Sequence, residues 1–203
     1  MSERWIPFDA ADADESPFEQ WQKWYAEGSL EVREPEAISI STADGAGRIS
    51  SRMVLLRSFD RRGFVWFTNY DSHKGRDIAA NPVAALLWYC EPLGRQVRIE
   101  GRVERVSTEE SDAYFSSRPR GHQIGAHASQ QSEPLSSRAA LEQRVAELEA
   151  EYEGREIPRP LHWGGLRLVP DHFEFWQHRR DRLHDRVLYF PEGDAWRRQR
   201  YAP

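Results

Sequence analysis

Three basic side chains recur at alternate positions near the end of the chain. Arg182, His184 and Arg186 lie shortly after the segment 175–177. If a strand, hairpin, strand unit forms here, the three side chains share one face, because strand side chains repeat every two residues. Two guanidiniums and an imidazole side by side repel one another unless they face an anion or an electron-rich ligand. The spacing therefore predicts a binding site, with an ordinary surface row as the alternative.

A second candidate is Lys74, near the start of a helix predicted over 72–80. Ser72 has the type and position of an N-cap, which places Lys74 in the first helical turn. A cation there opposes the helix dipole, and the conflict disappears if an anion binds the free N–H groups. A phosphate site and an ordinary surface lysine fit this pattern equally well.

Four further residues could contact anions. Arg52 and Arg57 flank an apolar run, so they either contact an anion or mark the two ends of a buried strand. Tyr114 and Arg118 are four residues apart on a helix predicted over 108–117, so they share a face and could grip one anionic group together.

A polar loop and one tryptophan complete the set. Gln131 and Ser132 offer amide and hydroxyl groups to a ligand, with plain solvent exposure as the alternative. Trp176 is either a core residue or an aromatic platform beside the basic row. The set comprises two anion sites, the polar face of the strand predicted over 96–104, and Trp176 as an aromatic platform. It fits one phosphorylated flat cofactor and one phosphorylated or carboxylated substrate.

The composition restricts the class of protein. With 203 residues, 39% hydrophobic and 30% charged, the chain fits one soluble globular domain, and its net charge of -5 gives no case for nucleic-acid binding. No apolar run reaches the roughly 20 residues of a membrane span and the N-terminus is acidic, so we expect a cytoplasmic protein. Cys90 is the one cysteine, which excludes a disulfide within the chain. The histidines lack familiar metal-site spacing, so we predict no metal.

Apolar periodicity predicts a mainly β fold, a small closed or half-closed antiparallel β-barrel with a few peripheral helices. Residues 1–16 have no periodic pattern and are expected to form a mobile arm, followed by a single domain over 17–203. The motif Arg118-Pro119-Arg120 is expected to end a helix. The predicted helices cover 18–28, 72–80, 108–117 and 137–153. The predicted strands cover 37–42, 53–57, 64–68, 83–90 and 96–104, followed by two hairpin-like units over 165–177 and 183–200.

Taken together, the motifs resemble those of the pyridoxamine/pyridoxine 5'-phosphate oxidase family. The resemblance extends from about residue 17 to the end of the chain, where Trp196 and Ala202-Pro203 match as well. Each motif is weak alone, but the ordered set is specific. The motifs are RMVLLR at 52–57, FTN at 67–69, SHK at 72–74, RQV at 95–97, YFSSRPR at 114–120, QIGA at 123–126, QS at 131–132, EFWQ at 174–177 and RLHDR at 182–186.

The resemblance implies an antiparallel split β-barrel that forms an FMN-dependent homodimer, with FMN at the subunit interface. It also implies that the protein oxidises pyridoxamine or pyridoxine 5'-phosphate to pyridoxal 5'-phosphate and reduces O2 to H2O2. It implies that Arg182 and His184 frame the substrate ring and act in catalysis. The substrate contacts would be Arg57, Tyr114, Arg118, Arg182 and His184. The FMN contacts would be Arg52, Met53, Val54, Leu55, Leu56, Arg57, Thr68, Lys74, Gln96, Gln131, Ser132, Trp176 and Arg186.

The chain departs from the family pattern at positions that bear on the substrate. Arg57 stands where the family usually has lysine, His122 where it has serine and His73 where it has arginine. His178 and Arg179 stand where it has small residues. The arginine and tyrosine of the family's N-terminal lid have no match in residues 1–16.

Three hypotheses follow from the sequence. The first is oxidation of the phosphorylated vitamers. The second is a related flavin oxidase that acts on another anionic ring compound, such as a phenazine precursor. The third is a split-barrel protein that binds flavin without turnover. Formation of pyridoxal 5'-phosphate separates the first from the second, and formation of peroxide separates both from the third.

Overall fold

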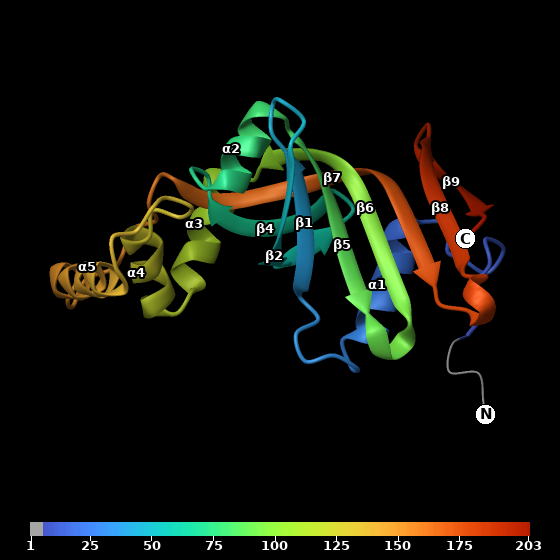
Figure 1. Ribbon diagram of the computed structural model, residues 1–203, viewed down its shortest axis with the longest axis horizontal. Helices are drawn as coiled ribbons and strands as arrows, with labels where there is room; N and C mark the ends of the chain where they lie inside the picture. The colour runs from blue at the N-terminus through green and yellow to red at the C-terminus, as the bar shows by residue number, and fades with distance from the viewer. Residues whose placement is uncertain (1–5) are drawn as a thin grey trace.

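Strands with alternating apolar residues form one curled antiparallel sheet, which is the main element of the fold (Figure 1). The computed structural model describes residues 6–203. Within them the sheet has nine strands: β1 (Ala37–Ala43), β2 (Ile49–Leu55), β3 (Ser58–Asp60), β4 (Gly63–Asn69), β5 (Val83–Cys90), β6 (Arg95–Arg105), β7 (Trp163–Gln177), β8 (Asp185–Glu192) and β9 (Ala195–Tyr201).

The strand order is β2-β1-β5-β6-β7-β4-β3, and β8 pairs with both β7 and β9. Just after the end of β2, the Arg57 N–H donates to the Val65 carbonyl of β4 at 2.8 Å, and this hydrogen bond links the end of β2 to β4. The strand β6 alternates buried and partly exposed residues over most of its length, as predicted. The predicted split barrel is therefore confirmed.

The strand β7 corrects one prediction, because residues 165–177 form no hairpin. Pro170 and Asp171 are residue types common in turns, but both lie inside a single strand of 15 residues. The pairing register between β6 and β7 shifts between Glu100 and Gly101, opposite this point. A bulge accommodates a proline, which has no N–H to give to the ladder. One long strand therefore connects the two ends of the molecule.

Helices lie at the edges of the sheet. They are α1 (Pro17–Gly28), α2 (His73–Ala80), α3 (Thr108–Ser117), α4 (Arg120–Ala128) and α5 (Arg138–Glu151), with short 3-10 helices η1 (Glu91–Leu93) and η2 (Arg180–Arg182). α1 packs Trp21 edge-on against Phe64 and Trp88, with ring centroids 5.2 and 5.6 Å away. This aromatic contact belongs to the main core of the barrel.

A smaller core lies under α3, α4 and α5, at the end of the molecule away from β8 and β9 (Figure 1). Its buried members are Phe115, Ile124, Leu148, Ile157 and Trp163. The sequence predicted α3 and α5 but not α4. Pro119 does end α3, because the residue before a proline is driven to an extended backbone, but it is also the N-cap of α4.

Part of the predicted N-terminal arm is anchored to the barrel. Residues 1–5 lie outside the described residues. Beyond them, the Phe8 N–H donates to the Asp185 carboxylate at 3.1 Å, and the Tyr189 hydroxyl donates to the Asp14 carbonyl at 2.8 Å. The segment 6–16 therefore packs on β8. No helix within residues 6–203 is both long and apolar enough to cross a bilayer.

Candidate active site

A cavity of about 780 Å³ lies between β2, β4, the start of α2 and the helices α3 and α4. The first residue of β7, Trp163, also lines it. Many of the predicted site residues meet here although they come from distant parts of the sequence. They are Met53, Val54, Leu55, Arg57, Thr68, Lys74, Tyr114, Arg118 and Gln131.

Lys74 is a buried cation in the wall of this cavity. Ser72 caps α2 by accepting a hydrogen bond from the Gly75 N–H, as predicted. The Lys74 ammonium donates to the Gln131 side-chain oxygen at 2.7 Å and to the Ser72 hydroxyl at 3.1 Å. The residue is 8% exposed and pairs with no carboxylate among residues 6–203. Burial, and to a smaller extent the nearby charge of Arg52, lower the pKa of Lys74 to about 8.

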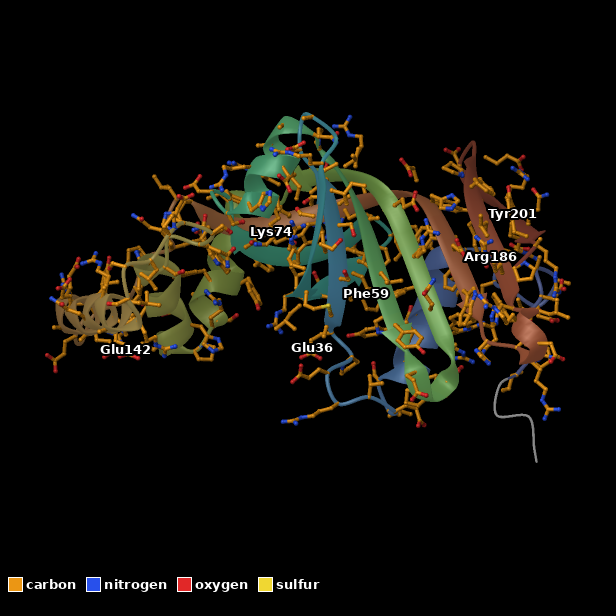
Figure 2. All side chains as sticks on the ribbon, viewed as in Figure 1. Glu36, Phe59, Lys74, Glu142, Arg186 and Tyr201 are labelled. Carbon is orange, nitrogen blue, oxygen red and sulfur yellow. The ribbon has the colours of Figure 1, made fainter. Side chains whose placement is uncertain are left out.

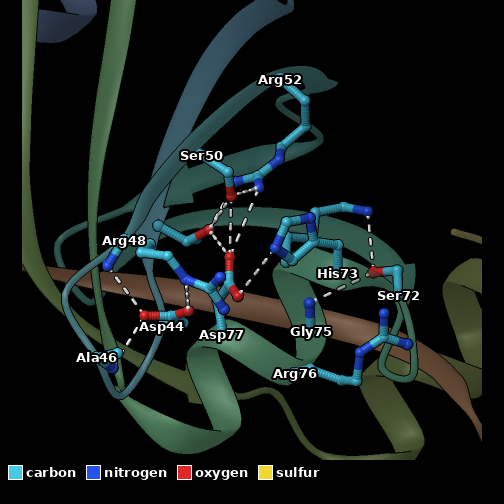
Figure 3. Close-up of polar contacts among 12 residues, drawn as sticks. Asp44, Ala46, Arg48, Ser50, Arg52, Ser72, His73, Gly75, Arg76 and Asp77 are labelled. Atoms are coloured by element: carbon cyan, nitrogen blue, oxygen red, sulfur yellow. Dashed lines mark hydrogen bonds and ion pairs between the residues drawn. The ribbon is translucent and has the colours of Figure 1, made fainter.

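Asp77 of α2 holds Arg52 next to this position (Figure 3). Its buried carboxylate accepts hydrogen bonds from Thr42 at 2.6 Å and Ser50 at 3.0 Å, and it lies 3.7 Å from the Arg52 guanidinium. Burial alone would raise the pKa of Asp77, but these hydrogen bonds and the charges of His73 and Arg52 bring that pKa below its ordinary value. An ionised Asp77 therefore fixes Arg52, and Arg52 itself does not line the cavity.

Two further guanidiniums lie on aromatic rings at the other side of the cavity. The Arg118 guanidinium carbon is 4.6 Å from the Trp163 ring centroid, and that of Arg57 is 6.0 Å from the Tyr114 ring centroid. Burial lowers the pKa of Arg118, an effect that Tyr114 opposes and Arg57 increases. Neither guanidinium has a carboxylate partner within the described part of the chain. Two neighbouring cations without counter-ions make this side of the cavity suited to an anion.

The remaining predicted residues form a second cluster on β6, β7 and β8. Gln96 is directly opposite Trp176, and Trp176 is directly opposite Arg186, so the three make a row across the sheet. The ring of His184 lies 4.5 Å from that of Trp176. Glu174 accepts a hydrogen bond from Arg186 at 2.7 Å and holds its guanidinium.

A backbone hydrogen bond fixes the tautomer of His184 within this cluster. The Arg179 backbone N–H donates to His184 Nδ1 at 3.1 Å. A backbone N–H only donates, so Nδ1 accepts and the proton of the neutral ring lies on Nε2. Burial lowers the pKa of His184, and the neighbouring His178 and Arg182 lower it further. The ring therefore presents a neutral N–H donor at Nε2.

The structure corrects the prediction that Arg182, His184 and Arg186 share one face of a strand. β8 begins at Asp185, and Arg182 ends the short helix η2 with a φ of 63°. Asp181 has a φ of 55° as well. Left-handed backbone is uncommon for residues other than glycine, and it is found preferentially at functional sites. Two such residues in succession turn the chain tightly just before His184.

One other prediction about the site's geometry is wrong, and two of the predicted FMN contacts lie outside the cavity. Tyr114 and Arg118 do not share a helix, because Arg118 has an extended backbone after the end of α3; the cavity nevertheless brings them together. Leu56 is buried and does not line the cavity. Ser132 is exposed, has a φ of 74° and does not line the cavity either.

One chain does not bring the two clusters together. In Figure 2, Lys74 lies below α2 and Arg186 lies on β8, at opposite sides of the barrel. Trp163 in the cavity and Trp176 in the second cluster are 13 positions apart on β7. That spacing corresponds to roughly 40 Å of extended strand, less the curl of the sheet.

Sequence reasoning missed the residues that support these clusters. They are Phe67, Asp77, Trp163 and Glu174. Phe67 and Glu174 lie inside motifs that the family resemblance used, but no role followed from their positions. Asp77 looked like an ordinary acidic residue on a helix, and its buried contacts with β1 and β2 depend on the fold. Within residues 6–203, no group of three or more His, Cys, Asp or Glu could hold a metal ion.

Comparison with known proteins identifies the family. A family model described as pyridoxamine 5'-phosphate oxidase matches residues 27–152. A second, described as the pyridoxine 5'-phosphate oxidase C-terminal dimerisation region, matches residues 163–203. The chain belongs to the pyridoxamine 5'-phosphate oxidase family. The first match covers the cavity residues other than Trp163, and the second covers Trp163, Trp176 and Arg186.

Relatives from this family match nearly the whole chain. A pyridoxine/pyridoxamine 5'-phosphate oxidase of Rubrobacter xylanophilus is 55% identical over 94% of this chain and 88% of its own length. The protein of the same name from Bordetella petrii is 54% identical over 93% of this chain and 90% of its own length.

Two solved structures have the same fold. One is PhzG from Burkholderia lata 383, in complex with tetrahydrophenazine-1-carboxylic acid. It is 34% identical, has a TM-score of 0.91 and covers 98% of both chains. The other is a pyridoxamine 5'-phosphate oxidase-related, FMN binding protein from Nostoc punctiforme. It is 18% identical, has a TM-score of 0.72 and covers 93% of this chain and 98% of its own, so it supports the fold alone.

Proposed function

We propose that this protein is an FMN-dependent oxidase that converts pyridoxine or pyridoxamine 5'-phosphate to pyridoxal 5'-phosphate. The observation that carries the proposal is that one cavity holds two separate cations, Lys74 and Arg118, without carboxylate partners in the described chain. Two cations at different points suit two phosphate groups, one on the cofactor and one on the substrate. The family relationship to proteins named for this reaction supports the same pair of ligands.

The residues around Lys74 fit the phosphate of FMN. Lys74 stands in the first turn of α2, where helix N–H groups and a buried ammonium favour an anion. Arg52, held by Asp77, adds positive charge close by, and Gln131 and Thr68 offer polar groups. On this proposal the phosphate end of FMN lies at Lys74, and the row Gln96, Trp176 and Arg186 contacts its ring.

The other side of the cavity suits the substrate phosphate. Arg57, Tyr114 and Arg118 all line the cavity, and two guanidiniums with a phenol hydroxyl suit a phosphate. When bound, FMN would supply the redox chemistry, a two-electron oxidation of the substrate at its C4' carbon coupled to the reduction of O2 to H2O2. His184 offers an N–H at Nε2 to the substrate ring and Arg182 supplies positive charge, so that these residues orient the ring before the reaction.

The separation of the two clusters leads us to propose a homodimer with shared sites. If one ligand pair uses both the cavity and the second cluster, the two clusters must come from different copies. A twofold interface would pair each cavity with the partner's cluster and create two equivalent sites. The match of residues 163–203 to a dimerisation region supports this arrangement. We also propose a cytoplasmic location, which suits a chain whose single cysteine, Cys90, is buried.

The pKa of Lys74 predicts how FMN binding depends on pH. In the free protein Lys74 loses its proton as the pH rises through about 8, whereas the phosphate is already fully ionised above a pKa of about 6. We therefore expect the FMN dissociation constant to increase between pH 7 and pH 9.5. The Lys74→Arg protein, whose guanidinium stays charged, should lose most of this change. Quenching of flavin fluorescence measures the FMN dissociation constant of the wild-type and Lys74→Arg proteins at each pH. Identical pH profiles for the two proteins would contradict the assignment.

A second candidate function comes from the structural comparison. PhzG, in complex with tetrahydrophenazine-1-carboxylic acid, has the same fold, and a carboxylate would also suit Arg57 and Arg118. The relatives named pyridoxine/pyridoxamine 5'-phosphate oxidase are more similar to this chain in sequence than PhzG is. The Rubrobacter xylanophilus protein is 55% identical to it, and PhzG is 34% identical. We therefore place oxidation of the vitamer phosphates first and oxidation of a phenazine precursor second.

Aerobic assays with matched substrates test the proposal. FMN-loaded protein should form pyridoxal 5'-phosphate and H2O2 in equal amounts from pyridoxine 5'-phosphate, and far more slowly from unphosphorylated pyridoxine. Peroxide from a reduced phenazine carboxylic acid but not from the vitamers would favour the second candidate. No peroxide from any of them would indicate a flavin-binding protein without turnover.

A further inference from the structure

Trp163 belongs to a stack of aromatic rings in the cavity wall. Its ring centroid is 5.5 Å from that of Phe67 and 6.2 Å from that of Tyr114, and the three rings are nearly parallel, with angles of 16° and 5°. Phe115 meets the same ring edge-on at 5.2 Å. With 6% of its surface exposed, Trp163 is fixed on several sides. It has no role in the assignments made so far.

Arg118 lies over the face of this indole. Its guanidinium carbon is 4.6 Å from the ring centroid, within the range of a cation–π interaction. The Arg118 Nη1 atom is buried and has no hydrogen-bond partner within residues 6–203. A buried N–H without an acceptor is costly, and the electron-rich ring face is the group that can offset this cost. The position of Arg118 therefore depends on the ring.

The backbone around Trp163 holds the ring in place. The Trp163 N–H donates to the Pro160 carbonyl at 3.0 Å, and its own carbonyl accepts from Arg159 Nη1 at 2.6 Å. Arg159 is in turn bound to Asp112 of α3 at 2.6 Å. The extended backbone that precedes Pro119 brings Arg118 to the ring from the end of the same helix. Both partners are thus attached to α3.

We propose that Trp163 is a positioning residue that holds Arg118 for the substrate phosphate and so sets the preference for phosphorylated over unphosphorylated substrates. This inference rests on the proposed function. Trp163 acts through Arg118: its ring face holds the guanidinium flat and desolvated, so that the remaining N–H groups are oriented before an anion arrives. The electrostatic property of the ring matters as well as its volume.

Fluorinated tryptophans at position 163 test this directly. Fluorine withdraws electron density from the ring face but keeps its shape, so the fold is preserved. The readout is the dissociation constant of inorganic phosphate on FMN-loaded protein, by titration calorimetry. We expect the affinity to fall stepwise with the number of fluorines, to about tenfold weaker for the most fluorinated ring. FMN affinity should not change. A phosphate affinity that is independent of fluorination would overturn the inference.

A double-mutant cycle gives a second test. Trp163→Leu should raise the KM for pyridoxine 5'-phosphate about tenfold and leave kcat within about twofold, and Trp163→Phe should restore most of the loss. In the Arg118→Ala background, Trp163→Leu should have no further effect on KM. Equal effects in both backgrounds would mean that Trp163 is only a core residue of the region under α3 and α4.

The outcomes separate this inference from the proposed function. If the protein forms pyridoxal 5'-phosphate but its phosphate affinity does not depend on ring fluorination, the proposed function stands and the inference about Trp163 is wrong. If the protein forms no pyridoxal 5'-phosphate but its phosphate affinity falls with fluorination, the proposed function is wrong and Trp163 still positions Arg118 for an anion.

Discussion

Arg118→Ala and Arg182→Ala proteins, each nearly inactive alone, should recover about a quarter of wild-type activity when the two chains are co-expressed and purified together. Each single variant removes a charged contact from every site, so we expect each to lose roughly 100-fold in kcat/KM. In a mixed dimer, one site receives both changes and the other receives neither. Random pairing makes about half of the dimers mixed, each with one intact site.

The control is a pair of variants from the same cluster. Arg118→Ala combined with Tyr114→Ala leaves every site with an altered cavity, so activity should stay at the level of the single variants. Equal recovery from both pairs, or no recovery from Arg118→Ala with Arg182→Ala, would contradict a site shared between subunits.

Lys74→Ala should weaken FMN binding by roughly 10- to 100-fold, because it removes a charged hydrogen-bond donor from the phosphate. The dependence of FMN affinity on salt should also decrease, since one cation fewer faces the phosphate. Lys74→Arg is the matched control and should keep most of the affinity at neutral pH. Titration of the apoprotein with FMN at two salt concentrations measures both effects. An unchanged FMN affinity in Lys74→Ala would place the phosphate elsewhere.

Local signals in the sequence predicted much of the fold and part of the site. Ser72 has the chemistry of an N-cap, and it does cap α2, so the position of Lys74 in the first turn followed from neighbouring residues alone. The alternation along β6 depends only on the strand period and one buried face. The family motifs selected the residues that line the cavity, although they are dispersed over about 80 positions of the sequence.

Tertiary context explains what sequence reasoning missed. Pro170 locally favours a turn, but a bulge at Asp171 of β7, opposite Glu100 and Gly101 of β6, lets the strand continue. The left-handed backbone of Arg182 has no local signal, because it occurs there without a glycine. Trp163 reads as a core residue, and its contact with Arg118 appears only when α3 and β7 pack together. That the two clusters lie apart in one chain could not be inferred from their order in the sequence.

Flavin bound to this protein should accept electrons from a phosphorylated vitamer. The measurement is the visible absorbance of FMN-loaded protein after pyridoxine 5'-phosphate or pyridoxamine 5'-phosphate is added without oxygen. We expect rapid bleaching, with pyridoxal 5'-phosphate formed in an amount equal to the flavin. A flavin that stays yellow with both vitamers, in protein that binds FMN normally, would contradict the proposed activity.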